Sequence, residues 1–377
     1  MLKEFLTPVS KELREFAAGL DPFSIGRNLN FHTELEPGSL VIFSVRETRG
    51  GESDYNPELE FNAVRKAFYQ LKKGDWHLPV YDLGDLDPGA TRQDTYFVFR
   101  KIQEEILKSG SVAIILGGAS SLAYYQFRAF DSVKLNVNLT AIDNRFRLGN
   151  DKEDLSYANY LSKIISEPPH NLFEYTHFGH QTYFVAQEEL DLMEHLNFEV
   201  KRLGKLLENM SEAEPELRNS DAVVMNLESI QSSDFQSSVK RSPNGFSSRE
   251  ICLLARYAGI NNKLRSFGVY NYKAENIETD DLLLSEILWY FIEGKNHAPE
   301  TDFSETGQFE KFYVQIPEQD LTFYHNTKTD QWWLELSEMN DARDGGKQII
   351  PCSQKDYETS LAGKIPERWW KSYKKLY

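Results

Sequence analysis

A chain of 377 residues, 40% hydrophobic and 13% aromatic, is long and apolar enough to bury a core, which excludes a disordered protein. A formal net charge of −16 argues against nucleic acid as a partner, because such binding requires Lys and Arg to displace counterions from phosphate. No apolar run approaches the roughly 18 residues of a membrane span, the charged N-terminus has no signal-peptide core, and the two cysteines show no ligand spacing, so we expect a cytoplasmic protein.

Strand-like and helix-like segments alternate between residues 39 and 296. The expected strands are short apolar runs at Leu40–Val45, Leu78–Leu83, Val112–Leu116, Leu135–Ile142, Ala222–Leu227 and Ser266–Tyr270. Helical patterns separate them, at Pro57–Leu71, Arg92–Lys108, Ser120–Phe130, Ser247–Tyr257 and Asp280–Phe291. Continuous apolar runs are typical of strands that are covered on both faces. The pattern therefore predicts an α/β protein, a three-layer α/β/α sandwich with a mainly parallel sheet.

The flanking segments differ from this pattern. Residues 1–38 are expected to form a helical N-terminal segment, and residues 297–377 a strand-rich extension packed on the main domain. The expected strands of the extension are Phe309–Ile316, Leu321–Tyr324 and Gln331–Leu336. The basic stretch Trp369–Lys375 is expected to be a solvated tail whose aromatic residues pack onto the domain.

Several segments at the expected strand ends match the motifs of one enzyme family in their order and spacing. They are Asp82–Asp85 (DLGD), Ile115–Leu122 (ILGGASSL), Thr140–Arg147 (TAIDNRFR), Met225–Glu228 (MNLE) and Ser242–Glu250 (SPNGFSSRE). In these segments the chain resembles the ureohydrolases, a family that includes arginases, agmatinases and formimidoylglutamases. Leu172–Phe184 (LFEYTHFGHQTYF) is most similar to the formimidoylglutamase branch. The resemblance implies an arginase-like fold from about residue 40 to residue 294.

The resemblance also implies two manganese ions, which two His and four Asp would hold and whose bridging hydroxide would attack a guanidinium or amidine carbon. The corresponding positions in this chain are occupied by Ser120, Asp143, Arg145, Arg147, Asn226 and Glu228. Only Asp143 is unchanged, and Arg cannot bind a metal ion because it stays protonated and offers only donors. We therefore expect a divergent formimidoylglutamase-like protein with degenerate metal motifs and no metal cofactor.

The two arginines suggest what could replace the metal ions. Arg145 and Arg147 are expected to form a salt-bridge network with Asp143 and Glu228. This network either fills the old cavity or lets the arginine pair bind a small anion such as a carboxylate or phosphate. Glu250 matches the family Glu that contacts the cationic group of the substrate, but its spacing from Ser247 equally predicts a capping box at a helix start.

Two functions follow from these alternatives. The first is a catalytically degenerate ureohydrolase-fold protein that acts as a binding, scaffold or assembly protein, with a small anionic ligand or a protein as its partner. Self-association is expected by analogy with the family. The second is a metal-dependent C–N hydrolase of a formimidoyl or guanidino compound. It would bind manganese at a mononuclear site of Asp143, Asn226 and Glu228 and contact the substrate through Glu250.

Overall fold

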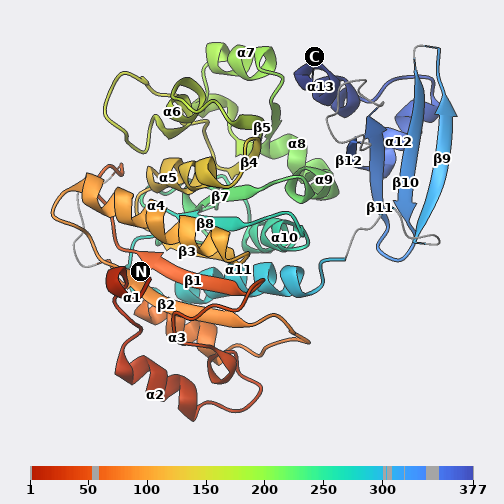
Figure 1. Cartoon of the computed structure of the whole chain (residues 1–377). Coiled ribbons are helices and arrows are strands. Elements are labelled where there is room, and N and C mark those ends of the chain that lie inside the picture. The colour runs from red at the N-terminus through yellow and green to blue at the C-terminus, as the bar shows by residue number, and fades with distance from the viewer. Residues whose placement is uncertain are drawn as a thin grey trace.

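The main part of the molecule is an eight-stranded parallel sheet, shown in the computed structural model in Figure 1. The structure describes residues 2–52, 59–299, 303, 308–317, 319–336 and 348–376. The strand order is β2-β1-β3-β8-β7-β4-β5-β6. The strands are β1 (Leu40–Val45), β2 (Val80–Leu86), β3 (Val112–Gly117), β4 (Val137–Ile142), β5 (Leu172–His180), β6 (Glu199–Arg202), β7 (Ala222–Asn226) and β8 (Ser266–Tyr270). The predicted parallel sheet is thus confirmed.

Helices cover both faces of this sheet, and each face has its own hydrophobic cluster. Alternate residues of β1 show the division, because Leu40 and Ile42 belong to one cluster and Val41 and Phe43 to the other. The first cluster includes α3 (Asn62–Gln70), α10 (Ser248–Gly259) and α11 (Glu278–Asn296). The second includes α4 (Arg92–Lys108), α5 (Leu122–Arg128), α6 (Tyr160–Ser166) and α7 (Gln187–His195). The α/β/α sandwich is therefore confirmed.

The second strand lies further along the chain than the sequence predicts, so the segment Asp82–Asp85 lies inside β2 rather than after it. Gly84 makes this possible, because it has a φ of +91° and a Cβ there would lie 2.1 Å from the Thr7 carbonyl oxygen. Both aspartates are buried and pair with Arg65 of α3, at 2.9 Å for Asp82 and 2.7 Å for Asp85. They stabilise the attachment of α3 to the sheet.

Other element boundaries also differ from the predictions. The expected helix Pro57–Leu71 begins at Asn62, and residues 57 and 58 of that prediction lie outside the described part of the chain. The strand expected from Leu135 begins at Val137, since Leu135 is 88% exposed. The N-terminal segment contains α1 (Leu2–Phe5) and α2 (Lys11–Gly19), and its buried residues join the clusters of the main sheet.

The described residues between 309 and 376, which we call the C-terminal extension, form a second sheet with two helices. This sheet is antiparallel in the order β12-β11-β10-β9, with β9 (Phe309–Gln315), β10 (Asp320–Asn326), β11 (Gln331–Leu336) and β12 (Gln348–Cys352). The helices are α12 (Gln354–Leu361) and α13 (Glu367–Leu376). The stretch expected to be a solvated tail instead lies in the helix α13. The expected packing of its aromatic residues is confirmed for Trp369, which is buried and whose ring stacks on that of Tyr373 at 4.8 Å.

The described residues include no helix with the length and apolar character that crossing a membrane requires.

Candidate functional site at the carboxyl ends of the strands

Polar side chains gather where four neighbouring strands of the main sheet end. Ser120 follows β3, Asp143 follows β4, and Asn226 and Glu228 lie at the end of β7. Asn271 follows β8, which lies between β3 and β7. All five residues are buried. Because the strands are parallel, their carboxyl ends meet at one edge of the sheet, where α/β proteins place their ligand sites.

Arg147 is the centre of this group. Its Nε donates to Asp143 Oδ2 at 2.8 Å, and its Nη2 donates to Asp143 Oδ1 at 3.0 Å and to Glu228 Oε2 at 2.7 Å. All three side chains are fully buried. Arg147 has a φ of +63°, a conformation that few residues other than glycine adopt. One guanidinium therefore joins the ends of β4 and β7.

Two asparagines extend the network to the neighbouring strands. Asn226 Nδ2 donates to Asp143 Oδ2 at 2.8 Å. Asn271 Nδ2 donates to Asn226 Oδ1 at 3.1 Å and to Glu228 Oε1 at 3.0 Å, while its Oδ1 accepts from the Ser120 amide at 2.9 Å. Asn271 was not among the residues that the sequence motifs predict for the site. Its position could have indicated it, because Asn271 is a polar residue directly after the apolar run Ser266–Tyr270.

The electrostatics favour a charged guanidinium at this position. Burial alone would lower the pKa of Arg147, but Asp143 and Glu228 hold it above its usual value. Burial raises the pKa of Glu228, and Arg147 opposes that shift. Since no solvent reaches the three side chains, the attraction between them is only weakly screened.

Arg145 lies outside this network, which corrects the expected set of four residues. Its Nε donates to Asn144 Oδ1 at 3.1 Å, and its guanidinium lies 4.7 Å from the centre of the Phe184 ring. Its buried Nη2 has no acceptor, and no carboxylate pairs with it in the described part of the chain. The two arginines therefore have different environments, one paired and one unpaired.

Glu250 belongs to the capping box that the sequence predicts. The Ser247 amide donates to Glu250 Oε2 at 2.7 Å, and the Ser247 hydroxyl accepts from the Glu250 amide at 3.4 Å. This carboxylate therefore stabilises the start of α10.

Three histidines, His170, His177 and His180, lie close together in the sequence. His170 is exposed, whereas His177 and His180 are buried with ring centres 6.0 Å apart. Burial lowers the pKa of His177 to about 3 and that of His180 to about 4, so both are neutral near pH 7. His177 Nε2 lies 3.0 Å from the Asp143 carbonyl oxygen, a contact that supports the end of β4. Across the described ranges, no three His, Cys, Asp or Glu side chains form a group that could hold a metal ion.

Comparisons with known proteins connect this arrangement to one family. The sequence pattern of the arginase family matches residues 52–270. An "uncharacterized 32.2 kDa protein in hmfB 3'region" of Methanothermus fervidus is 25% identical over 208 residues, which cover 47% of this chain and 71% of that protein.

Solved structures of three hydrolases are similar to this chain in fold. Formimidoylglutamase of Bacillus subtilis superposes with a TM-score of 0.62 at 14% identity, over 71% of this chain and 90% of that chain. Formiminoglutamase of Trypanosoma cruzi with Mn²⁺ gives 0.61 at 14% identity, over 70% and 95%. Agmatine ureohydrolase of Thermoplasma volcanium gives 0.59 at 16% identity, over 75% and 97%.

Proposed function

This chain belongs to the arginase family, and we propose that it is a catalytically degenerate member that acts by binding rather than by hydrolysis. The observation that carries the proposal is the position of Arg147. Its guanidinium occupies the place between Asp143 and Glu228 where the resemblance implies manganese. An organic cation that is part of the chain would then neutralise the carboxylates that remain.

The hydrogen bonds of the two carboxylates support this reading. Both oxygens of Asp143 accept from Arg147, and both oxygens of Glu228 accept from Arg147 or Asn271. A metal ion would have to displace these donors. It would also be repelled by the guanidinium, by about 4 kcal/mol per unit charge at 4 Å with an effective dielectric of 20. The residues present therefore do not fit a manganese pair.

The same contacts argue against the alternative hydrolase. A mononuclear site would use oxygens of Asp143, Asn226 and Glu228, and these oxygens already accept hydrogen bonds. The Glu250 carboxylate, which would contact the substrate, accepts from the Ser247 amide. Self-association and a cytoplasmic location stay predictions from the sequence.

Metal content tests the proposal. After dialysis against excess Mn²⁺ and then against metal-free buffer, elemental analysis of the wild-type protein should find far less than one equivalent. A variant that restores the family's residues, with Ser120→His, Arg145→His, Arg147→Asp and Asn226→Asp, should retain more. About two equivalents in the wild type, together with metal-dependent release of urea or formamide, would overturn the proposal.

Arg145 is the position we propose for an anionic ligand. Two contacts hold its guanidinium in place, yet it pairs with no carboxylate in the described part of the chain. A positioned guanidinium binds a carboxylate or phosphate through charge-assisted hydrogen bonds. Arg147 is unsuitable for this role because its charge is already shared by two carboxylates.

Calorimetric titration with succinate and with inorganic phosphate tests this position. We expect one of the two anions to bind, and Arg145→Met to weaken the binding about tenfold or more, as the loss of a charge-assisted hydrogen bond predicts. Arg14→Met, on the exposed surface of α2, carries the same change of charge and should bind like the wild type. Equal affinity in wild type and Arg145→Met, or no binding of either anion, would contradict the assignment.

A further inference from the structure

The main domain and the C-terminal extension have separate apolar cores. Of the three hydrophobic clusters among the described residues, two lie on the faces of the main sheet and contain no residue of the extension. The third contains only residues of the extension, among them Phe323, Leu334 and Trp369. The family match, which ends at residue 270, also stops before the extension. Apolar burial therefore holds each part together and contributes little to joining them.

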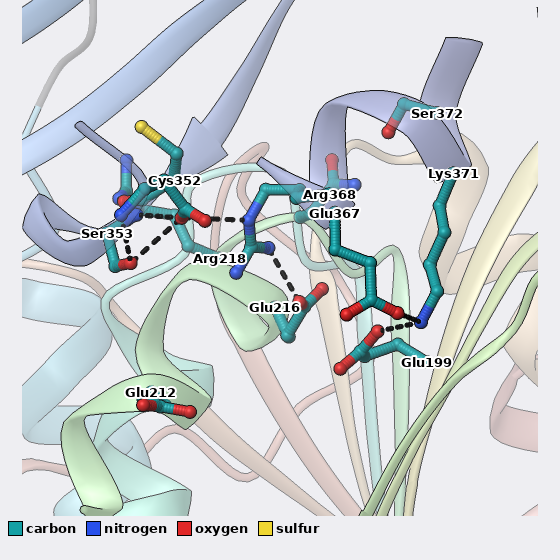
Figure 2. Close-up of polar contacts among 12 residues, drawn as sticks. Glu199, Glu212, Glu216, Arg218, Cys352, Ser353, Glu367, Arg368, Lys371 and Ser372 are labelled. Carbon is teal, nitrogen blue, oxygen red and sulfur yellow. Dashed lines mark hydrogen bonds and ion pairs between the residues drawn. The ribbon is translucent and has the colours of Figure 1, made fainter. Parts of the chain in front are cut away.

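Among the described residues, the ion pairs that join the two parts all have the same polarity. In each of four pairs the cation belongs to the extension and the carboxylate to the main domain. The pairs are Lys355–Glu212 at 2.7 Å, Arg368–Glu216 at 2.6 Å, Lys371–Glu199 at 2.6 Å and Lys375–Glu174 at 3.9 Å. Figure 2 shows the second and third of these pairs side by side. We call these four ion pairs the clasp.

Arg218 of the main domain adds polar contacts of a second kind. Its Nη2 donates to the Trp332 carbonyl oxygen at 3.0 Å, and its guanidinium lies 4.2 Å from the centre of the Trp333 ring. These contacts join the two parts through a hydrogen bond and a cation–π contact instead of apolar packing.

The boundary also contains several cavities. Cavities of about 310, 340 and 250 Å³ lie along it, and each is lined by residues of both parts. Every charged residue that lines the first cavity is already in an ion pair, and three of these pairs join the two parts. Boundaries within a chain that are not large and hydrophobic usually allow one part to move relative to another.

The extension contacts the main sheet at the amino end of β6. β6 is the last strand in the sheet order and therefore an edge strand. Lys371 of α13 pairs with Glu199, the first residue of β6, and the Lys375 ammonium lies 5.6 Å from the centre of the Phe198 ring. An edge strand presents unpaired N–H and C=O groups to any chain that approaches.

From these observations we infer that the C-terminal extension is a reversible cover of the edge strand β6, held in place by the clasp. Loss of one charge of the clasp weakens the docking without disturbing either core, because the cores do not cross the boundary. The undocked molecule exposes β6 and the carboxylates beside it. The inference does not depend on whether the protein binds metal.

Charge reversal and charge exchange test the cover on the full chain. Hydrogen–deuterium exchange is measured for amides of β6 and α13 in the wild type, Lys371→Glu, Glu199→Lys and the double variant. Each single variant should raise exchange several-fold in both elements and increase the radius of gyration in solution scattering. The double variant, which restores an ion pair with reversed signs, should return both values towards the wild type.

The controls separate undocking from local damage. Lys371 also pairs with Glu367 within α13, so a glutamate at its position repels a neighbour in the same helix. That repulsion persists in the double variant, so rescue there shows that the clasp is responsible. Lys11→Glu disrupts the exposed pair with Glu15 on α2 and should leave exchange in β6 and α13 unchanged. Wild-type exchange in both single variants, or no recovery in the double variant, would overturn the inference.

Discussion

At the scale of single residues, the main feature of the candidate site is the guanidinium of Arg147, which pairs with two buried carboxylates. Arg147 is a part of the chain, so it neutralises Asp143 and Glu228 without a free ligand. Its left-handed backbone costs about 1–2 kcal/mol, and its Nη1 has no hydrogen-bond partner. The three ionic hydrogen bonds offset these costs. Two buried carboxylates would otherwise face each other without a counter-charge.

Arg147→Met should therefore destabilise the protein by about 3–5 kcal/mol, the usual cost of removing one partner of a buried ion pair. The reason is that Asp143 and Glu228 stay buried while the hydrogen bonds and the positive charge are lost. Urea unfolding at pH 7 measures the change. Arg145→Met removes the same charge from a half-buried position that has no ion pair, so its cost should be much smaller. Equal destabilisation in the two variants would contradict the central role of Arg147.

At the scale of elements, the crossing of α10 and α11 buries a lysine. Gly259 and Gly294 let the two helices approach closely, since a Cβ at Gly259 would lie 2.2 Å from the Phe291 carbonyl oxygen. Lys295, near the end of α11, points into this region and donates to the carbonyl oxygens of Asn261 and Leu264. It ties α11 to the loop between α10 and β8. No carboxylate pairs with it in the described ranges.

Lys295 should make stability depend on pH. Burial lowers its pKa from 10.5 to about 7. Between these values the unfolded chain binds more protons than the folded chain, so the free energy of unfolding should rise with pH. The gain should be complete above pH 10.5, lost as the pH falls to 7, and of the order of a few kcal/mol.

Unfolding midpoints measured from pH 7 to 10 test this expectation. The rise with pH should be flatter in Lys295→Met than in the wild type, whatever the absolute stability of the variant. Lys11→Met removes a charge from the exposed face of α2 and should retain the slope of the wild type. Parallel curves for wild type and Lys295→Met would show that Lys295 does not titrate in this window.

At the scale of the whole molecule, the candidate site and the extension lie at opposite ends of the strands. Asp143 and Asn226 lie at the carboxyl ends of β4 and β7. Glu174 and Glu199, which contact the extension, lie near the amino ends of β5 and β6. Because the sheet is parallel, these ends face away from each other. The extension therefore does not cover the candidate site.

The sequence by itself determined the α/β class and most of the parallel strands, and it predicted the replacement of the family's metal ligands. These features depend on local information: apolar runs of strand length, and side chains that either can or cannot coordinate a cation. The capping box of Ser247 and Glu250 is local in the same way, because its partners lie three residues apart.

Only the tertiary structure decided which arginine pairs with the carboxylates and which remains unpaired. Arg145 and Arg147 are two residues apart in an irregular segment, and the backbone conformation of Arg147 directs its side chain back to Asp143. Asn271 joins the site only because β8 lies between β3 and β7. The docking of helix α13 likewise depends on residues far away in the chain, among them Glu199 and Glu216. Contacts between residues far apart in the chain leave no periodic pattern in the sequence, and those contacts determine the site and the docking of the extension.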